Sequence, residues 1–233
     1  MVNNERSALL LGKEKLENLK EKTVLVLGVG GVGSFCVEAL ARTGIGHLIV
    51  VDKDVVEASN INRQLIATTE TIDRIKVDVI KERIHILNPD CIVDTHAWFY
   101  DASKDGELFS RPIDFVIDCI DSIASKQDLI QACIQRKIPF LCSMGTARRL
   151  DPTKLEVMEL EKTSYDPIAK RLRSWKRKNR IKEKIWVVAS KEPAKPVIEG
   201  QPLPSMIFVP ASAGLLLASE CIRRLSEFAS SSK

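Results

Sequence analysis

The chain has 233 residues, 45% of them apolar and 28% charged, and a formal net charge of +4. A chain this apolar can bury a sizeable core, which excludes disorder as its main state. No window of about 18 residues lacks charges and helix breakers, and the apolar run near the N-terminus is too short for a secretory signal, so we expect a globular cytoplasmic protein with no membrane span.

The six cysteines are scattered along the chain and form no C-x-x-C pair. This spacing argues against a disulfide framework and against a four-cysteine zinc site, and it favours reduced thiols. The three histidines, His47, His85 and His96, show no metal-ligand spacing either, so we expect structural or surface roles for them. The sequence therefore predicts no zinc site.

The first part of the chain alternates apolar runs with segments of helical periodicity. The run TVLVLG is apolar throughout, as in a strand buried on both faces of a parallel sheet. A glycine turn, a helical segment and a second apolar run follow it, which is the opening of a doubly wound α/β fold. The pattern predicts strands over 23–28, 47–52, 91–97, 114–121 and 138–145, and helices over 8–20, 34–44, 72–87 and 122–136.

From about residue 150 the pattern changes to alternating apolar and polar residues, which is typical of antiparallel strands. The elements expected here are strands over 154–160, 184–190 and 206–210, a proline-rich loop over 191–205 and a helix over 211–225. The expected fold is a Rossmann-like, doubly wound, mainly parallel sheet with C-terminal antiparallel strands and a basic helical segment. We expect a single domain over 1–233, with a nucleotide-binding core over 1–145 and a C-terminal elaboration over 146–233.

The basic segment spans 170–184 and reads KRLRSWKRKNRIKEK. It holds nine Lys or Arg against one Glu, so it carries +8 and leaves the rest of the chain at −4. Such an asymmetry is typical of a protein with a polyanionic partner, the alternative being an unengaged charged helix. Trp175 lies among these charges, where it can stack on an unpaired base or pack into the core beneath a solvated face.

Three glycines, Gly28, Gly30 and Gly33, form a G-x-G-x-x-G motif between a predicted strand and a predicted helix. Glycines permit the tight turn and let backbone N–H groups approach a phosphate at the helix N-terminus. Asp52 closes the next strand, 19 residues after Gly33, where it is placed to accept a hydrogen bond from a ribose hydroxyl. The motif predicts a nucleotide site but does not separate NAD, FAD and ATP.

Polar residues around the glycine turn narrow the choice of nucleotide. An Asn, an Arg and a Lys are donors suited to triphosphate oxygens, and a simple dinucleotide dehydrogenase needs no such set, although each cation taken singly has the alternative of a solvated surface residue. Asp121 follows a predicted buried strand, where it can hold Mg²⁺ between phosphates. The additional candidates are Gly31, Asp54, Asn60, Arg63, Gln64 and Lys76.

The motifs GVGGVG at 28–33, VDKDVVEASNINRQ at 51–64 and DCID at 118–121 resemble the ThiF/MoeB/HesA family, the relatives of ubiquitin-activating enzymes. The resemblance implies ATP-dependent adenylation of a carboxylate on a homodimeric Rossmann-like fold. It implies that Gly31 and Asp52 line the adenosine pocket and that Asp121 manages Mg²⁺ and the leaving group. The residues implied to hold the phosphates are Asn60, Arg63, Gln64 and Lys76, joined by Arg6 from the partner subunit.

The chain departs from the sulfur-carrier branch of this family, because it lacks paired C-x-x-C motifs and has no cysteine between residues 146 and 205. The segments 144–178 and 208–219 resemble instead the branch of tRNA threonylcarbamoyladenosine dehydratases. That likeness implies a modified adenosine next to the anticodon as substrate, whose carboxylate ATP activates before an internal attack closes a ring with loss of water. It implies tRNA as a partner, with proteins of the cysteine desulfurase system as candidate sulfur-transfer partners.

The candidate tRNA-binding residues lie in the basic segment and just after the fifth predicted strand, where two arginines have the alternative of ordinary surface residues. They are Arg148, Arg149, Arg171, Arg173, Trp175, Lys176, Arg177, Lys178 and Arg180.

Two other functions stay open on the sequence. The first is an adenylyltransferase that activates the C-terminus of a ubiquitin-like sulfur-carrier protein; the basic segment and the missing cysteine pairs speak against it. The second is an NAD-dependent oxidoreductase or a nucleotide-binding module; the turn SNINRQ and Lys76 speak against it.

Overall fold

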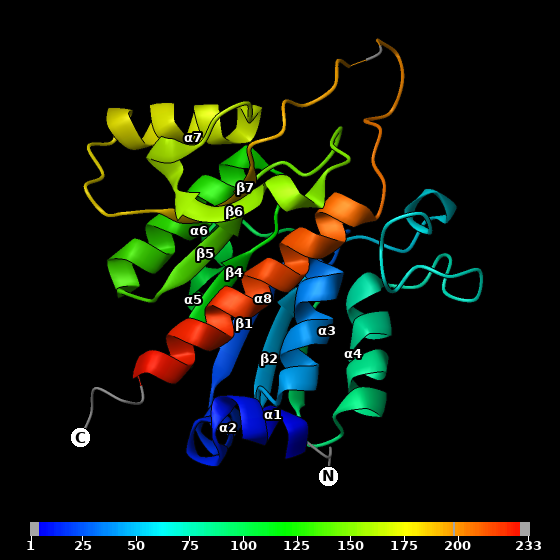
Figure 1. Cartoon of the computed structure of the whole chain (residues 1–233), viewed down its shortest axis with the longest axis vertical. Helices are drawn as coiled ribbons and strands as arrows, with labels where there is room; N and C mark the ends of the chain where they lie inside the picture. The colour runs from blue at the N-terminus through cyan, green and yellow to red at the C-terminus, as the bar shows by residue number, and fades with distance from the viewer. Residues whose placement is uncertain (1–4, 198, 229–233) are drawn as a thin grey trace.

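The computed structural model describes residues 5–197 and 199–228, and these residues form a seven-stranded sheet with helices on both faces (Figure 1). The strand order is β3-β2-β1-β4-β5-β7-β6. All neighbouring strands are parallel except β6 and β7, which are antiparallel. The strands are β1 Thr23–Leu27, β2 His47–Val51, β3 Ile92–His96, β4 Phe115–Asp118, β5 Phe140–Ser143, β6 Leu155–Glu159 and β7 Trp186–Ser190. The predicted fold class is confirmed.

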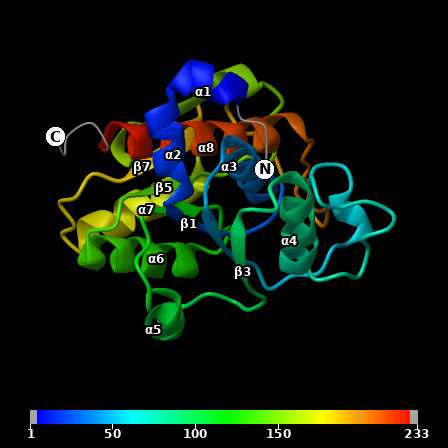
Figure 2. The ribbon, with the colours of Figure 1, turned by 90° about the horizontal axis from the view of Figure 1, so that it is seen from below.

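Helices cover the two faces of this sheet in separate layers, as Figure 2 shows from below. One core cluster packs α2, α3, α4 and α8 on the first face, and two smaller clusters pack α5, α6 and α7 on the second. The helices are α1 Glu5–Leu11, α2 Lys13–Lys20, α3 Gly33–Thr43, α4 Lys76–Leu87, α5 Asp105–Leu108, α6 Ile123–Arg136, α7 Pro167–Lys178 and α8 Phe208–Phe228, with short 3-10 turns at Ala58–Asn60, Ala102–Lys104, Pro152–Lys154 and Leu160–Lys162. Because both faces are covered, the central strands are apolar throughout.

The predicted strand over 206–210 is wrong, because α8 begins at Phe208. A short apolar run does not distinguish a strand from the first turn of a buried helix, and a proline at position 210 is tolerated in that turn. The helix packs closely on α3: a Cβ on Gly214 would lie 2.2 Å from the backbone oxygen of Val32.

Two predicted helices also have different bounds. Gly12, with φ +94°, separates α1 from α2 within the single helix expected over 8–20. The helix expected from residue 72 begins at Lys76 after a turn in which Asp73 has φ +66°. A left-handed residue interrupts the helical backbone in both places, whereas the apolar spacing runs through.

Helices α3 and α4 are joined by a nearly buried carboxylate. Glu38 of α3 is 9% exposed, and it accepts hydrogen bonds at 2.7 Å from Nε of Arg42 and from Nε of Arg83 on α4. Burial by itself would raise the pKa of Glu38, but the hydrogen bonds from Arg83 and Arg42 lower that pKa below its ordinary value. The interaction therefore stabilises the fold only while Glu38 is ionised.

We expect Glu38→Gln to lower the free energy of unfolding at neutral pH by about 1–3 kcal/mol, since two arginines lose their charged partner. A lowered pKa means that this contribution is complete above the unfolded pKa, about 4.3, and is lost as the pH falls through the folded value. Urea unfolding from pH 7 to pH 3 measures the difference between the two proteins. A difference that stays constant down to pH 3 would contradict the assignment.

Candidate active site

A cleft of about 700 Å³ opens at the carboxyl ends of the parallel strands. Its position is where the strand order reverses around β1, the place at which open α/β sheets bind ligands. The cleft brings together residues from the ends of β1, β2, β4 and β5, which are far apart in the sequence. Of the predicted nucleotide-binding set it is lined by Gly28, Gly30, Gly31, Asp52, Asp54, Asn60, Arg63, Gln64, Lys76 and Asp121.

The glycine turn is as tight as its sequence predicts. Gly28 has φ +91°, and a Cβ there would lie 2.7 Å from the backbone oxygen of Cys119. A Cβ on Gly33 would lie 1.7 Å from the oxygen of Gly28, so Gly33 packs the first turn of α3 onto the strand and does not line the cleft. Gly28, Gly30 and Gly31 form the part of the turn that lines the cleft. The helix N-terminus is thereby open to an anionic group.

Asp52 is held at the end of β2 by two backbone donors. Its carboxylate accepts hydrogen bonds from the N–H of Val29 at 2.6 Å and from the N–H of Asp54 at 2.8 Å. Burial raises the pKa of Asp52 above its ordinary value, against the opposing effect of these two hydrogen bonds. The carboxylate is thus fixed in the cleft as an acceptor, the position in which such folds bind ribose.

Two cations of the cleft, Lys76 and Arg63, are positioned by contacts within residues 54–76. Lys76, the first residue of α4, is 5% exposed, and its Nζ lies 3.2 Å from Oδ2 of Asp54. Arg63 donates from Nη1 to the backbone oxygen of Ser59 at 2.8 Å, which directs its side chain along the cleft wall. Both cations line one cavity beside the glycine turn, where phosphate oxygens would meet them.

Gln64 and Asp121 present acceptor oxygens without partners among the described residues. Oε1 of Gln64 is buried with no hydrogen bond, although buried polar atoms are normally paired. Asp121, in the loop after β4, is exposed in the cleft. A free carboxylate beside a phosphate site suits a hard divalent cation such as Mg²⁺.

Sequence reasoning missed a buried ion pair beneath this loop. Asp118 ends β4 and Lys126 lies on α6; their Oδ2 and Nζ atoms are 2.8 Å apart, and neither side chain is more than 1% exposed. Nζ also donates to the backbone oxygen of Ser143 at 3.1 Å. Burial alone would lower the pKa of Lys126, but the Asp118 charge raises it above its ordinary value. A lysine on the apolar face of the predicted helix was the available signal.

We expect Lys126→Met to lower the free energy of unfolding by about 3–5 kcal/mol, because it leaves the buried Asp118 charge without its cationic partner. The double variant Asp118→Asn, Lys126→Met removes both charges and should recover most of that loss. Urea unfolding of the three proteins tests this. A double variant as unstable as the single one would show that the two side chains act separately.

The predicted tRNA-binding residues divide into buried and exposed groups. The exposed ones are Arg171, Arg177, Lys178 and Arg180, and Arg148 lines the cleft. Helix α7 ends at Lys178, so the predicted basic segment continues as a loop towards β7.

Three residues predicted to bind tRNA have side chains that the structure directs into the protein, which corrects that prediction. Arg149 is 3% exposed and donates to the backbone oxygens of Gly145, Tyr165 and Glu192, which ties the loop after β5 to the start of α7. Lys176 is 8% exposed and pairs with Glu161. Trp175 packs against the apolar cluster under α7, which is the core position considered as its alternative. Their sequence neighbourhood is basic, but their side chains face the protein.

Arg173 lies between these groups. It is partly buried, and its guanidinium donates to the oxygen atoms of Thr163. Its guanidinium is therefore already hydrogen-bonded to the turn before α7.

Arg6 does not reach the cleft of its own chain. It lies on α1, which with α2 occupies the end of the molecule beside the amino ends of the strands (Figure 1). The cleft opens at the other end of the sheet and Arg6 is not part of its lining. Its supply from a partner subunit stays a prediction.

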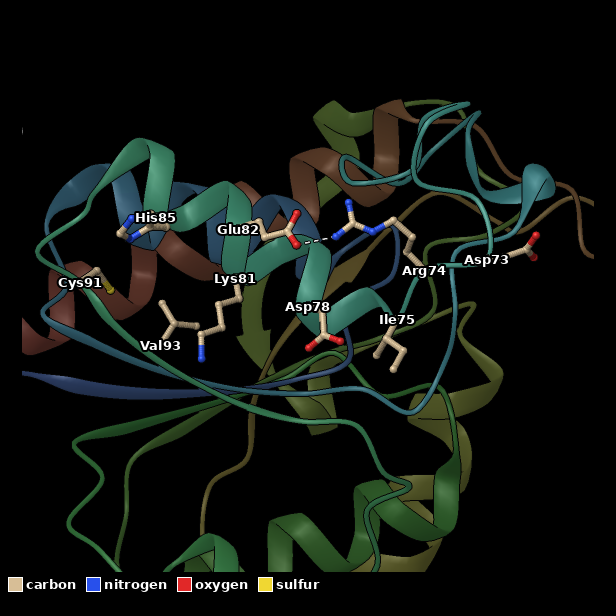
Figure 3. A pocket seen from close by; sticks show the side chains of 9 residues that line it. All are labelled: Asp73, Arg74, Ile75, Asp78, Lys81, Glu82, His85, Cys91 and Val93. Atoms are coloured by element: carbon tan, nitrogen blue, oxygen red, sulfur yellow. Dashed lines mark hydrogen bonds and ion pairs between the residues drawn. The ribbon is translucent and has the colours of Figure 1, made fainter.

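A second cavity, of about 670 Å³, lies between α4 and the edge strand β3 (Figure 3). Its charged residues include Arg74 and Glu82, which pair with each other. It contains neither the glycine turn nor any of the predicted site residues. Most of the residues predicted to bind the nucleotide line the first cleft instead.

The six cysteines are all free thiols. Burial raises the pKa of Cys91 to about 12 and raises that of each of the other five above its ordinary value. They are therefore protonated at neutral pH and are not activated nucleophiles. Within residues 5–197 and 199–228, no cluster of three or more His, Cys, Asp or Glu could hold a metal ion, and no helix is long and apolar enough to cross a membrane.

The sheet, the glycine turn and the polar cleft define an α/β nucleotide-binding protein. More narrowly, the chain belongs to the ThiF family, whose sequence pattern matches residues 4–233. It is 41% identical to the tRNA threonylcarbamoyladenosine dehydratase of Bacillus subtilis (strain 168), over 94% of this chain and 93% of that relative. The crystal structure of the E. coli tRNA N6-threonylcarbamoyladenosine dehydratase, TcdA, in complex with ATP superposes with a TM-score of 0.91 at 33% identity, covering 98% of this chain and 96% of that one.

Proposed function

We propose that the protein dehydrates threonylcarbamoyladenosine next to the anticodon of tRNA, using ATP to adenylate the carboxylate of the modification. The observation that carries this is a nucleotide cleft at the switch point of a chain whose similarity to the Bacillus subtilis dehydratase runs over nearly the whole of both proteins. All 233 residues act as one adenylating domain in this proposal.

The chemistry explains why ATP is needed. A carboxylate is a poor electrophile because its leaving group would be oxide. Attack of a carboxylate oxygen on the α-phosphorus of ATP forms the acyl–AMP bond and releases pyrophosphate. A nucleophile of the same side chain then attacks the acyl carbon, loses its proton and expels AMP, so the ring closes with net loss of water. Because that nucleophile is tethered, its effective concentration is high and no enzyme nucleophile is required.

The cleft residues bind and neutralise charge in this scheme. Arg63 and Lys76, with Asn60 and Gln64, hold the phosphates, and Asp52 accepts a hydrogen bond from a ribose hydroxyl. Asp54, which pairs with Lys76, orients that lysine towards the cleft. Mg²⁺, when bound with ATP, supplies further neutralisation of phosphate charge.

Asp121 is the residue to hold that ion, since its carboxylate faces the cleft without a partner among the described residues. Arg6 of a second copy adds a further cation, which makes the working enzyme a homodimer. We propose the cytoplasm as the location of the reaction and sulfur-transfer proteins of the cysteine desulfurase system as further partners.

The exposed basic residues of α7 and the loop after it bind tRNA in this scheme. They are Arg171, Arg177, Lys178 and Arg180, with Arg148 nearer to the cleft. Their charge, on an otherwise mildly acidic chain, supports a phosphate backbone as the ligand.

The test is ATP turnover to AMP and pyrophosphate with two alternative acceptors. We expect turnover to rise when tRNA bearing threonylcarbamoyladenosine is added, and no rise with the same tRNA lacking that modification. A small ubiquitin-like carrier protein serves as the other acceptor. Turnover that responds to the carrier and not to the tRNA would favour a carrier-protein adenylyltransferase instead.

A further inference from the structure

Phe99 is an aromatic side chain on the rim of the cleft that the predicted site leaves unused. Its side chain lines the cleft and the residue is 46% exposed. Its chain neighbours Trp98 and Tyr100 also line the cleft, but both are held by partners of their own. Tyr100 is 3% exposed and donates its hydroxyl hydrogen bond to Asp105 at 2.7 Å, and the ring of Trp98 lies 5.1 Å from that of His96. The anchored neighbours therefore hold Phe99 at the rim.

A cation from the adjacent strand end holds the Phe99 ring. Nζ of Lys53 lies 5.4 Å from the ring centroid, within the range of a cation–π interaction. Lys53 directly follows Asp52, whose N–H donates to the backbone oxygen of His96 at 3.1 Å. The ring of Phe99 is thus tied to the strand ends that also fix the carboxylate proposed to bind ribose.

The lining of the cleft includes both polar and apolar side chains. Arg63 lies beside the glycine turn, since a Cβ on Gly31 would lie 3.5 Å from Cγ of Arg63. The apolar part of the lining includes Leu27, Val51 and Ile120. These side chains belong to, or pack against, the apolar cluster on the sheet face that α5 and α6 cover. Because Lys53 directly follows Asp52, a nucleotide with its phosphates at the glycine turn and its ribose at Asp52 would bring its base near the Lys53–Phe99 pair.

We propose that Phe99 stacks on the purine base of ATP, with Lys53 fixing the ring. The inference rests on the proposed ATP site and adds the group that recognises the base. An aromatic ring can stack on any base, because every base has a π-face, so the Phe99 ring contributes affinity for the base without selecting among bases. The loss of one stacked ring corresponds to about 10- to 100-fold in affinity.

The experiment compares ATP with inorganic tripolyphosphate, which has the phosphates but no base, by isothermal titration calorimetry in the same magnesium buffer. We expect Phe99→Ala to raise the Kd for ATP about 10- to 100-fold and to leave the Kd for tripolyphosphate unchanged. Phe99→Trp should keep the wild-type Kd for ATP. Phe99→Leu, which retains an apolar side chain without a ring face, should behave like Phe99→Ala and covers the case in which that variant does not fold.

Phe109→Ala is the matched control. The Phe109 ring also has a cation beside it, Arg136 at 4.6 Å, but Phe109 does not line the cleft. Its Kd for ATP should equal that of the wild type. Unchanged ATP affinity in Phe99→Leu, or an equal loss for ATP and tripolyphosphate, would overturn the stacking role. A wild-type protein that binds tripolyphosphate but not ATP would overturn it too, whereas a wild-type protein that binds neither would remove the proposed ATP site as a whole.

Discussion

Replacing Arg63 by alanine is expected to lower kcat/KM for ATP-dependent turnover about 1,000-fold or more, since the cleft loses a cation placed for the transferring phosphates. The fold should be unaffected, because the Arg63 side chain lies at the cleft wall and bonds within its own turn, to Ser59 and Asn62. Release of AMP and pyrophosphate in the presence of modified tRNA measures the effect, and circular dichroism checks the fold.

Arg74→Ala is the matched control for this variant. Arg74 lies eleven residues further along the chain, is exposed and pairs with Glu82 outside the cleft. Its turnover should be close to that of the wild type. If Arg63→Ala and Arg74→Ala retained the same turnover, Arg63 would not belong to the catalytic set.

The second large effect is expected on tRNA binding. Neutralising the four exposed cations Arg171, Arg177, Lys178 and Arg180 should weaken tRNA binding about 100-fold at low salt, because fewer counterions are released from the phosphates. The slope of the logarithm of the tRNA association constant against the logarithm of the salt concentration should fall in magnitude by roughly 3. Each of the four lost phosphate contacts accounts for about 0.7–0.9 of that change. Filter binding of tRNA over a salt series measures both quantities.

A control variant neutralises an equal number of exposed lysines on other elements, namely Lys13, Lys20, Lys81 and Lys137. The net charge of the two variants then matches, so a general charge effect would weaken both equally. We expect the control to keep the wild-type salt slope, and both variants to bind ATP normally. An equal loss of tRNA affinity in the two variants would remove the surface of α7 from tRNA recognition.

The parallel half of the fold was predictable because its signals are local. Apolar runs such as TVLVLG and the glycine turn at Gly28 to Gly33 depend on few distant residues, and both lie where the sequence predicts them. The cleft residues were predictable for the same reason, since strand ends of a parallel sheet meet at one edge. The apolar run at 206–210 was misjudged because a short apolar run fits a strand or a helix start equally well, and α8 begins within it, at Phe208.

The remaining features depend on partners that are distant in the sequence. Lys126 becomes a buried cation only because β4 and β5 end beside α6. Arg149 loses its expected exposure because the loop after β5 folds under α7 and surrounds it with carbonyl oxygens. Phe99 carried no motif, and its place on the cleft rim follows from the pairing of β2 with β3. Charge counts along a segment do not reveal which side chains face inwards.

The most direct test of the account is mass analysis of the nucleosides of tRNA bearing threonylcarbamoyladenosine after incubation with the protein, with and without ATP. Asp121→Ala serves as the inactive control, since its loss should abolish turnover. We expect the modified nucleoside to lose the mass of one water only when ATP and the unaltered protein are both present. An unchanged nucleoside mass, in a reaction where the protein still converts ATP to AMP and pyrophosphate, would contradict this expectation.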